Sequence, residues 1–267
     1  MDWIVTGASR GIGRSLALAL GSRAAPEDRL FALARSSETL AALAGQISSC
    51  EAVPLAVDLS RVDAARAAGE QLAMKLRDGA TLIHNVGVWP TKLELVDGVE
   101  LGFAVNCLGP LAIQAPLLAA GKLARVLVVS AGLIIKGRFD PDATPTGADF
   151  SALRTYCTTK LAGAVAMREA ARLHPDVDFA IVHPGVVNTD LGDGSGLLAW
   201  LIRQVKRRWE SPDTCAARLV GLLARERWQT QPGHAPWFFE AEQQPWPTAV
   251  ERDAVAVLGL VRQYVEF

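Results

Sequence analysis

Short apolar runs alternate along the chain with longer stretches in which apolar residues recur every three or four positions. The short runs are typical of buried strands, and the longer stretches have the spacing of amphipathic helices. Strands are predicted at residues 3–5, 29–35, 53–57, 81–84, 125–129 and 179–182, with a last one at 236–240. Helices are predicted from residue 15 onward and at residues 37–46, 63–77, 99–118, 151–173 and 248–264.

The order of these elements determines the predicted fold class. Strands that alternate with helices pair in parallel, because each helix returns the chain to the starting end of the sheet. We therefore predict an α/β fold, a single doubly wound Rossmann domain whose mostly parallel sheet has helices on both faces. The length of 267 residues fits one large domain over residues 1–267, without an internal repeat or a linker.

Composition and charge argue against nucleic-acid binding and against a membrane-anchored protein. Half of the residues are apolar and the formal net charge is -1, so no surface for nucleic acid is expected. The first predicted strand begins almost at Met1, which leaves no room for a signal peptide or a membrane anchor. The longest apolar run near the C-terminus, residues 196–202, is far too short to span a bilayer. We expect a cytoplasmic protein without a membrane span.

The cysteines and histidines lack the spacing of metal ligands. The cysteines lie far apart without a CxxC pair, and we interpret them as small buried hydrophobic residues in a reducing compartment. They are Cys50, Cys107, Cys157 and Cys215. The 4 histidines are equally scattered. No metal site is predicted.

Three glycines follow the first predicted strand. Gly7, Gly11 and Gly13 separate this strand from a helix that opens at Ser15. Glycine lets the backbone approach a ligand closely, and the unpaired N–H groups of a helix N-terminus favour a phosphate. The spacing is GxxxGxG instead of the commoner GxGxxG of dinucleotide-binding folds. The alternative interpretation is a tight strand-to-helix turn that binds nothing.

Polar or glycine residues mark the C-terminal end of nearly every predicted strand. In an open parallel sheet these ends form one edge, and ligands bind along it. The residues at this edge are Thr6, Gly7, Arg35, Asp58, Asn85, Ser130, Pro184 and Gly185. A purely structural origin is the alternative, because loops are polar in most proteins.

Tyr156 and Lys160 are four residues apart within one predicted helix. This spacing places both residues on the same face of the helix. A free tyrosine has a pKa near ~10, and a neighbouring ammonium would lower that pKa toward the range useful for acid–base catalysis. The alternative is an ordinary amphipathic helix with a surface lysine.

Together these motifs closely resemble the short-chain dehydrogenase/reductase family over roughly the first 190 residues. The resemblance rests on residues 6–13, Asp58, residues 85–87, Asn106, the Tyr156–Lys160 pair and residues 184–189. Residues 97–109 and 182–187 look most like the retinol-dehydrogenase-like branch. The resemblance implies an oxidoreductase that transfers hydride between a nicotinamide and a small-molecule carbonyl or secondary alcohol.

The resemblance also implies a cofactor site. The turn at residues 7–13 would hold the pyrophosphate, Asp58 would bond the adenine amino group, and Asn85 would sit by the adenosine ribose. Thr189, with the backbone near Val187, would fix the carboxamide of the nicotinamide. The full implied set is Thr6, Gly7, Ser9, Arg10, Gly11, Ile12, Gly13, Arg35, Asp58, Leu59, Asn85, Val86, Gly87, Tyr156, Lys160, Pro184, Gly185, Val187 and Thr189.

The implied catalytic residues are Tyr156, Lys160, Asn106 and Ser130. Tyr156 would exchange a proton with the substrate oxygen, while Lys160 would lower the tyrosine's pKa and hold the nicotinamide ribose. Asn106 would anchor a water molecule that links this lysine to solvent. The cofactor supplies the difficult chemistry, and the protein orients and polarises the reactants.

Charge at the end of the second predicted strand indicates NADP(H). Arg35 stands where an acidic residue would indicate NAD. A second cation, Arg10, lies in the glycine turn, and two guanidinium groups suit the 2′-phosphate of NADP(H). The alternative is a pair of solvated surface arginines.

The sequence departs from the family pattern at two strand ends. The family's usual Asn-Asn-Ala-Gly is His84-Asn85-Val86-Gly87 here, which adds bulk near the adenosine. The family's catalytic serine aligns with Ala131. Ser130 would replace that serine only if the strand has already broken there, which Gly132 would permit, because neighbouring strand residues point to opposite faces.

Two classes of function remain open. One is an active reductase or dehydrogenase, and the other is an NADP(H)-binding sensor or scaffold with weak or lost catalysis. A bulky apolar substrate is expected, with residues 190–215 as a substrate lid. The candidate lining residues are Trp89, Leu133, Ile134 and residues 197–202, although the last could be a helix packed on the core. A homodimer, a homotetramer and a monomer all remain open, and the long stretch at residues 130–156 would wall the site or block dimer formation.

Overall fold

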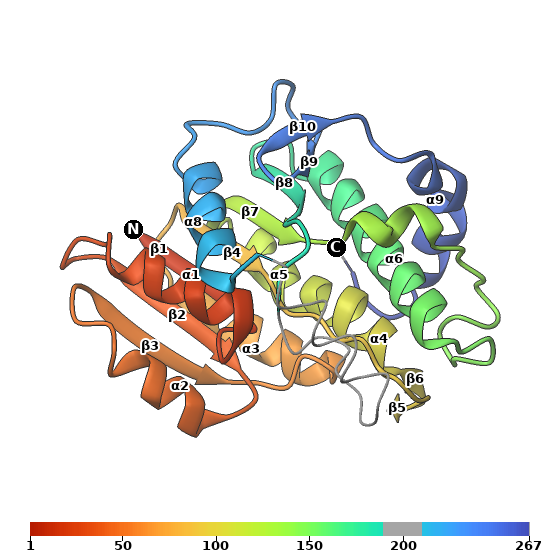
Figure 1. Cartoon of the computed structure of the whole chain (residues 1–267), viewed down its shortest axis with the longest axis horizontal. Coiled ribbons are helices and arrows are strands. Elements are labelled where there is room, and N and C mark those ends of the chain that lie inside the picture. The colour runs from red at the N-terminus through yellow and green to blue at the C-terminus, as the bar shows by residue number, and fades with distance from the viewer. Residues whose placement is uncertain (189–209, 267) are drawn as a thin grey trace.

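An eight-stranded sheet forms the centre of the computed structural model, which describes residues 1–188 and 210–266 (Figure 1). Its strand order is β10-β9-β8-β7-β4-β1-β2-β3. Neighbouring strands are parallel throughout, except that β10 is antiparallel to β9. The strands are β1 (Asp2–Thr6), β2 (Arg29–Ala34), β3 (Glu51–Ala56), β4 (Ala80–His84), β7 (Leu123–Val129), β8 (Asp178–His183), β9 (Trp237–Phe239) and β10 (Glu242–Gln244).

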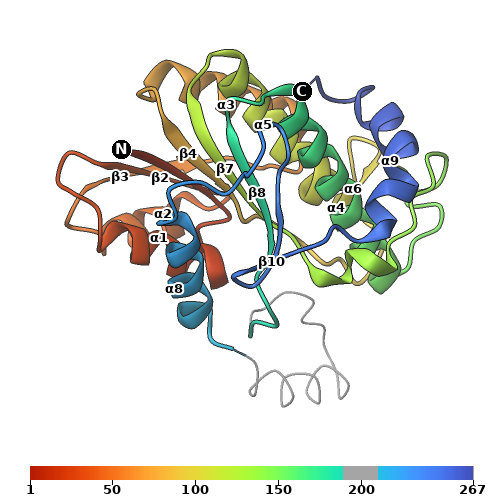
Figure 2. The same ribbon diagram turned by 90° about the horizontal axis from the view of Figure 1, so that it is seen from above.

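Helices cover both faces of the sheet (Figure 2). Alternate strand residues enter opposite cores: Ile4 packs in one hydrophobic cluster and the next residue, Val5, packs in the other. One face carries α1 (Gly11–Gly21), α2 (Ser37–Ala44) and α8 (Pro212–Leu223). The other face carries α3 (Val62–Lys75), α5 (Gly109–Ala119), α6 (Ala152–Leu173) and α9 (Thr248–Val261). The predicted doubly wound α/β fold is confirmed.

The single helix predicted at residues 99–118 is wrong in detail. A small hairpin, β5 (Leu95–Val96) and β6 (Val99–Glu100), comes first, and α4 (Leu101–Phe103) follows. Residues Ala104–Leu108 then form a π-helical turn before α5 begins. The chain passes another loop closely here, since a Cβ on Gly109 would lie 2.0 Å from the Leu59 carbonyl oxygen. Such π turns are frequent at functional sites.

Helix α8 was not predicted, and it includes the last residues of the expected lid segment. Ser211 caps the helix by accepting a hydrogen bond from the Thr214 N–H at 3.1 Å, and Pro212 follows at the first helical position. The buried residues Cys215 and Leu219 lie in the same hydrophobic cluster as α1. Residues 212–215 therefore belong to a helix packed on the domain. The other expected lid residues up to 209 lie outside the described residues.

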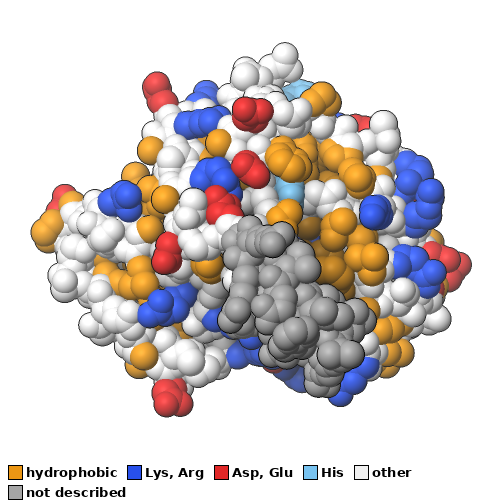
Figure 3. Space-filling model, in the orientation of Figure 1, with side chains coloured by type: hydrophobic (Ala, Val, Ile, Leu, Met, Phe, Trp, Pro, Cys, Tyr) orange, Lys and Arg blue, Asp and Glu red, His pale blue; other side chains and the backbone are white. Residues whose placement is uncertain are grey.

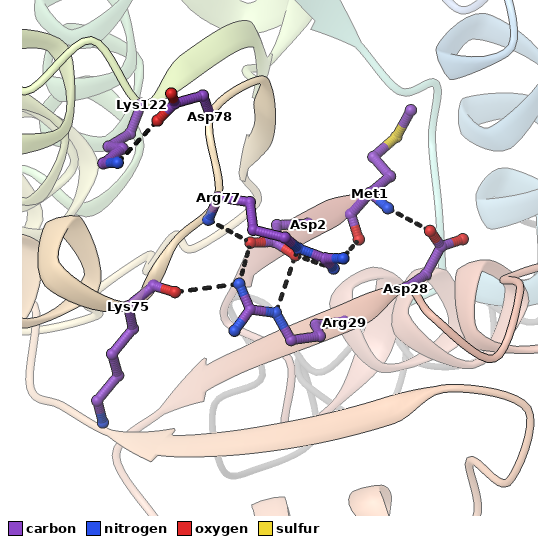
Figure 4. A network of polar contacts seen from close by, with 8 residues as sticks. All are labelled: Met1, Asp2, Asp28, Arg29, Lys75, Arg77, Asp78 and Lys122. Atoms are coloured by element: carbon purple, nitrogen blue, oxygen red, sulfur yellow. Dashed lines mark hydrogen bonds and ion pairs between the residues drawn. The ribbon is translucent and has the colours of Figure 1, made fainter.

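A network of ion pairs joins the N-terminal ends of the central strands (Figure 4). The Asp2 carboxylate, in β1, has no exposed side-chain surface and accepts hydrogen bonds from Arg29 and Arg77. The main-chain N–H of Arg77 also donates to it, at 2.8 Å. Burial alone would raise the pKa of Asp2, but these bonds outweigh burial and lower it to about 2. The network joins β1, β2 and the segment before β4.

Candidate active site

A cavity of about 780 Å³ opens along the C-terminal ends of the parallel strands. It spans the point where the strand order reverses, between β1 and β4, which is where doubly wound folds bind ligands. Most of the predicted cofactor-binding residues line this one cavity. They are Gly7, Ser9, Arg10, Gly11, Ile12, Arg35, Asp58, Leu59, Asn85, Val86, Gly87, Tyr156, Lys160, Pro184, Gly185 and Val187.

The glycine turn has the close packing that a phosphate cradle requires. Gly7 and Gly11 have φ of 68° and 54°, a region that side chains disfavour. A Cβ on Gly13 would lie 2.2 Å from the Gly7 carbonyl oxygen, so only glycine fits there. Helix α1 begins directly at Gly11 and has no acidic residue in its first turn. The turn therefore fits the pyrophosphate of a dinucleotide.

Thr6 and Asn85 hold this turn against the end of β4. The Thr6 Oγ1 accepts hydrogen bonds from the main-chain N–H groups of Asn85 and Val86, at 3.1 and 3.2 Å. The Asn85 Nδ2 donates to the carbonyl oxygens of Thr6 and Gly7, at 3.2 and 3.3 Å. Both side chains thus shape the cradle from beneath. The placement of Asn85 beside a ribose stays a prediction.

Tyr156 lies in the N-terminal part of α6 and is only 5% exposed. The Trp89 indole stacks flat on its ring, with centroids 4.5 Å apart and planes 8° from parallel. Burial, and to a lesser degree the neighbouring Cys157 thiol, raises the pKa of Tyr156 above its ordinary value. The net shift is therefore opposite to the predicted lowering by Lys160, because loss of solvent around the phenol dominates.

Lys160 is buried beside the same cavity, one helical turn beyond Tyr156. Its Nζ donates a hydrogen bond to the Val129 carbonyl oxygen at 3.3 Å. Burial lowers the pKa of Lys160 to about 8. The ammonium passes close to Gly87, where a Cβ would lie 2.9 Å from Nζ. The glycine turn, Tyr156 and Lys160 thus meet at one cavity.

Comparisons with known proteins decide the family. The sequence pattern of the short chain dehydrogenase family matches residues 3–196. A Streptomyces sp. (strain C5) protein named provisionally as a daunorubicin C-13 ketoreductase is 30% identical over 200 residues, 72% of this chain and 68% of that protein. Human retinol dehydrogenase 12 is 31% identical over 210 residues, 75% of this chain and 66% of that protein. The chain belongs to the short-chain dehydrogenase/reductase family.

The relatives also support the retinol-dehydrogenase-like branch of this oxidoreductase family, although the matches span only about two thirds of the length of these relatives. Among solved structures, an alcohol dehydrogenase from the archaeon Thermococcus sibiricus, complexed with 5-hydroxy-NADP, superposes with a TM-score of 0.64. It is 23% identical, and the superposition covers 92% of this chain and 98% of that one. At this identity the likeness shows the fold alone.

Asn106, which the family resemblance makes catalytic, lies at the centre of the π-helical turn. Its side-chain amide bonds both ways with the Val88 backbone: Oδ1 accepts from the N–H and Nδ2 donates to the carbonyl oxygen, each at 2.9 Å. Nδ2 also lies 3.0 Å from the Thr159 hydroxyl oxygen. Asn106 therefore joins the loop that carries Trp89 to α6. Its predicted water-anchoring role stays a prediction.

The condition for Ser130 to replace the family's catalytic serine is not met. β7 ends at Val129, but the Ser130 main-chain N–H still bonds the Val182 carbonyl oxygen at 2.8 Å and Ala131 is extended, so the backbone keeps the geometry of a strand through this point. The Ser130 Oγ has no accessible surface and no partner among the described residues. A second, much smaller cavity of about 10 Å³ borders Ser130, together with His84, Asn106 and Lys160. Ser130 also lines the large cavity, but almost none of its hydroxyl oxygen is accessible there.

The expected substrate-lining residues are confirmed in part. Trp89 and Leu133 line the large cavity. Ile134, however, is completely buried in the hydrophobic core, because the chain turns into a 3-10 helix at Gly132 and points this side chain inward. Residues 197–202 and Thr189 lie outside the described residues.

Sequence reasoning missed residues that only the fold brings to the cavity. His183, at the end of β8, and Phe239, at the end of β9, both line it. Arg218 of α8 supports the same region, since its guanidinium donates to the Pro184 carbonyl oxygen at 2.8 Å and pairs with Glu210 and Glu240. The one available signal was the position of His183, directly before Pro184 at a predicted strand end.

Other sequence expectations concern metals, cysteines and the membrane. Residues 1–188 and 210–266 contain no group of three or more metal-binding side chains, and the four cysteines are free. Among the same residues, the segment Leu101–Ala119 is long and apolar enough to cross a membrane, but 83% of its apolar window is buried inside the domain. This is weak evidence for a span and is typical of a core helix. The expected absence of a metal or a span stays a prediction.

Proposed function

We propose that the protein is an NADP(H)-dependent oxidoreductase that transfers hydride between the nicotinamide and a carbonyl or secondary alcohol. One observation carries the proposal: Tyr156 and Lys160 line the same cavity as the glycine turn. An acid–base pair beside a dinucleotide cradle is the arrangement that hydride transfer with proton transfer requires.

The two arginines favour NADP(H) over NAD. Arg10 and Arg35 both line the cavity beside the glycine turn and the end of β2. Their guanidinium groups would bond the 2′-phosphate, and the residues directly after β2, Arg35 and Ser36, include no acid to accept from a free 2′-hydroxyl. Similar folds have been solved with 5-hydroxy-NADP and, in a Burkholderia cenocepacia short chain dehydrogenase, with NADP. Asp58 and Leu59 would border the adenine.

The residues of this chain give the reaction its proton chemistry. When bound, the reduced nicotinamide supplies the hydride that adds to the carbonyl carbon. The Tyr156 hydroxyl gives its proton to the carbonyl oxygen, whose π-electron pair forms the new O–H bond. With its pKa raised by burial, the Tyr156 phenol is protonated near neutral pH, which is the form that reduction requires. The buried Lys160 ammonium stabilises the phenolate that remains until solvent returns a proton through the region of Asn106.

The cavity favours a bulky, apolar substrate. Exposed Val186 and Phe239 line it together with Trp89 and Leu133. Hydrophobic side chains also gather on the surface in the right half of Figure 3. The names of relatives support the same class, since daunorubicin and retinol are the substrates named for two of them. A pocket lined mainly by apolar side chains gains binding energy from such substrates.

The alternative is a protein that binds NADP(H) with weak or lost catalysis, as a sensor or scaffold. The observation that favours it is Ala131, which leaves the family's serine position without a hydroxyl.

The oligomeric state is also proposed. Helix α9 packs along α6 (Figure 1) and also holds the segment that precedes α6, because the Asp253 carboxylate in α9 accepts a hydrogen bond from the Phe139 N–H at 3.0 Å. This covers one side of α6 and favours a monomer over the homodimer or homotetramer. Cytoplasmic localisation is likewise proposed.

The deciding experiment measures cofactor binding and turnover separately. NADPH and NADH titrations should give tighter binding for NADPH. A panel of aromatic and long-chain aldehydes and ketones should then oxidise NADPH, fastest with the larger apolar members. Tight NADPH binding without turnover of any carbonyl, or of the matching alcohols with NADP⁺, would establish the sensor class instead. Absence of dinucleotide binding would overturn both classes.

A further inference from the structure

His183 is a polar side chain that the proposed mechanism leaves unused. Its ring lies edge-on to Phe239, with centroids 4.7 Å apart and planes at 72°. On its other side it covers Gly132, where a Cβ would lie 3.0 Å from both Cδ2 and Nε2 of the imidazole. Any side chain at this position would crowd the ring, which would have to shift by a few tenths of an ångström. The ring is thus fixed at the edge of the large cavity, between the ends of β7 and β9.

The surroundings of the ring determine which nitrogen carries its proton. The Nδ1 atom has no accessible surface and no partner among the described residues. An unpaired buried N–H is rarer and costlier than an unpaired acceptor, so the hydrogen belongs on Nε2. Burial, with a further contribution from the nearby Arg218 cation, lowers the pKa of His183 to about 4. The ring is therefore neutral near pH 7, with one N–H to donate.

We propose that His183 is the second hydrogen-bond donor to the substrate oxygen and takes over the role of the serine that Ala131 replaces. The inference rests on the proposed function. Ala131 has no hydroxyl, and the Ser130 hydroxyl is inaccessible. His183 lies one strand away, since β7 and β8 are paired up to Val129 and Val182. It belongs to the same cavity as Tyr156.

The role requires no proton transfer from His183. During reduction the carbonyl carbon gains the hydride and the oxygen gains the Tyr156 proton, while the Nε2–H of His183 only donates a hydrogen bond. This bond strengthens as negative charge builds on the oxygen, so it stabilises the transition state more than the bound substrate. A donor of this kind raises kcat and leaves KM almost unchanged.

The test compares three variants with the wild type. His183→Leu removes the donor, and His183→Gln keeps a donor amide of similar reach. His174→Leu is the matched control at the C-terminal end of α6, far along the helix from Tyr156. On the ketone that the wild type reduces fastest, His183→Leu should lower kcat roughly 10- to 100-fold with unchanged NADPH affinity, and His183→Gln should lose much less. His174→Leu should behave as wild type.

A rescue experiment separates a donor from a packing role. In the His183→Leu background, Ala131→Ser should restore a large part of kcat, whereas the same change in the wild type should gain little. A second readout needs no turnover: in the complex with NADP⁺ and a ¹³C=O-labelled aromatic ketone, the carbonyl stretching frequency should rise when His183 becomes leucine, because a hydrogen bond is lost. If the leucine variant does not fold, His183→Phe supplies both measurements, because it keeps an aromatic ring beside Phe239 and lacks the N–H donor.

The outcomes distinguish a failure of the His183 inference from a failure of the proposed function on which it rests. If the wild type reduces a ketone and His183→Leu matches it in kcat and carbonyl frequency, His183 is not a donor and only this inference is overturned. Loss of kcat that Ala131→Ser fails to rescue, with an unchanged carbonyl frequency, shows a packing role and also overturns it. If the wild type binds NADPH but turns over nothing, the proposed function fails and the inference fails with it.

Discussion

Trp89 and Tyr156 form a parallel stack, with ring centroids 4.5 Å apart and planes inclined by 8°. The indole covers one face of the phenol, so a substrate reaches the hydroxyl only from the side that Trp89 leaves open. Asn106 holds the loop that carries the indole, through both polar groups of the Val88 backbone. Through Asn106 the π-helical turn holds the loop of Trp89, and the stacked indole helps to bury the phenol, whose pKa is raised by this burial.

Arg35 tests the cofactor preference. Changing Arg35 to alanine should weaken NADPH binding about ten- to a hundredfold, because a hydrogen bond to a charged group contributes ~1.5–3 kcal/mol. NADH binding should change little, since it lacks the phosphate. Fluorescence titration with both cofactors provides the measurement. Arg14→Ala is the control, because Arg14 of the same region bonds Gln46 at the surface. Equal losses for NADPH and NADH would show that Arg35 is structural.

Substitution of Ser130 tests whether its buried hydroxyl takes part in catalysis. Since the Ser130 hydroxyl is inaccessible and unpaired among the described residues, Ser130→Ala should change kcat by less than about threefold and leave thermal stability equal or slightly higher. Steady-state kinetics and a thermal melt suffice as measurements. A loss of about 100-fold in kcat, the effect of removing an aimed donor, would instead support the predicted catalytic role of Ser130.

The fold was predictable because the strand–helix alternation is local and strongly patterned. The π-helical turn was not, since it depends on the distant bonds between Asn106 and Val88 and on the contact of Gly109 with Leu59. Helix α8 was missed although Ser211 and Pro212 form a recognisable start. The partner of its apolar face, helix α1, is distant in sequence and lies beside it only in the folded structure.

The site was predictable where chemistry follows a motif and unpredictable where it depends on burial. The glycine turn, Tyr156 and Lys160 come from fixed spacing, and one cavity gathers them. The direction of the Tyr156 pKa shift was predicted wrongly, because the sequence does not show that Trp89 covers the ring. His183 was missed because its neighbours come from distant parts of the chain: Gly132 begins the 3-10 helix after β7, and Phe239 ends β9.

Lys160 links function and stability. Burial lowers its pKa from an ordinary 10.5 to about 8. Between those values the unfolded chain binds more protons than the folded one, so stability should rise with pH across this window. Lys160→Met should remove this rise, increase the free energy of unfolding at pH 7 by about 2 kcal/mol and abolish most turnover. Lys92→Met, at an 80% exposed side chain, is the control. Denaturant melts from neutral to alkaline pH that show no stabilisation would contradict the account.

Asp2 tests the network at the N-terminal edge of the sheet. Its folded pKa of about 2 lies below the ordinary value of 3.8, so its contribution is complete above the ordinary pKa and disappears as pH falls toward 2. Asp2→Asn should lower the free energy of unfolding at pH 7 by about 2 kcal/mol and flatten its acid dependence. Asp78→Asn, whose side chain is 82% exposed in its ion pair with Lys122, should cost less than about 0.5 kcal/mol. Equal effects of the two variants in denaturant melts would show that the buried network adds nothing.

The most direct test of the central claim is a single-turnover measurement on Tyr156→Phe. The variant keeps the ring and its stack with Trp89 but lacks the proton donor, so NADPH should bind with wild-type affinity. The rate of NADPH oxidation by the best ketone should fall by roughly 10² to 10⁴. A variant that binds NADPH normally and oxidises it at close to the wild-type rate would contradict the account and remove Tyr156 from the mechanism.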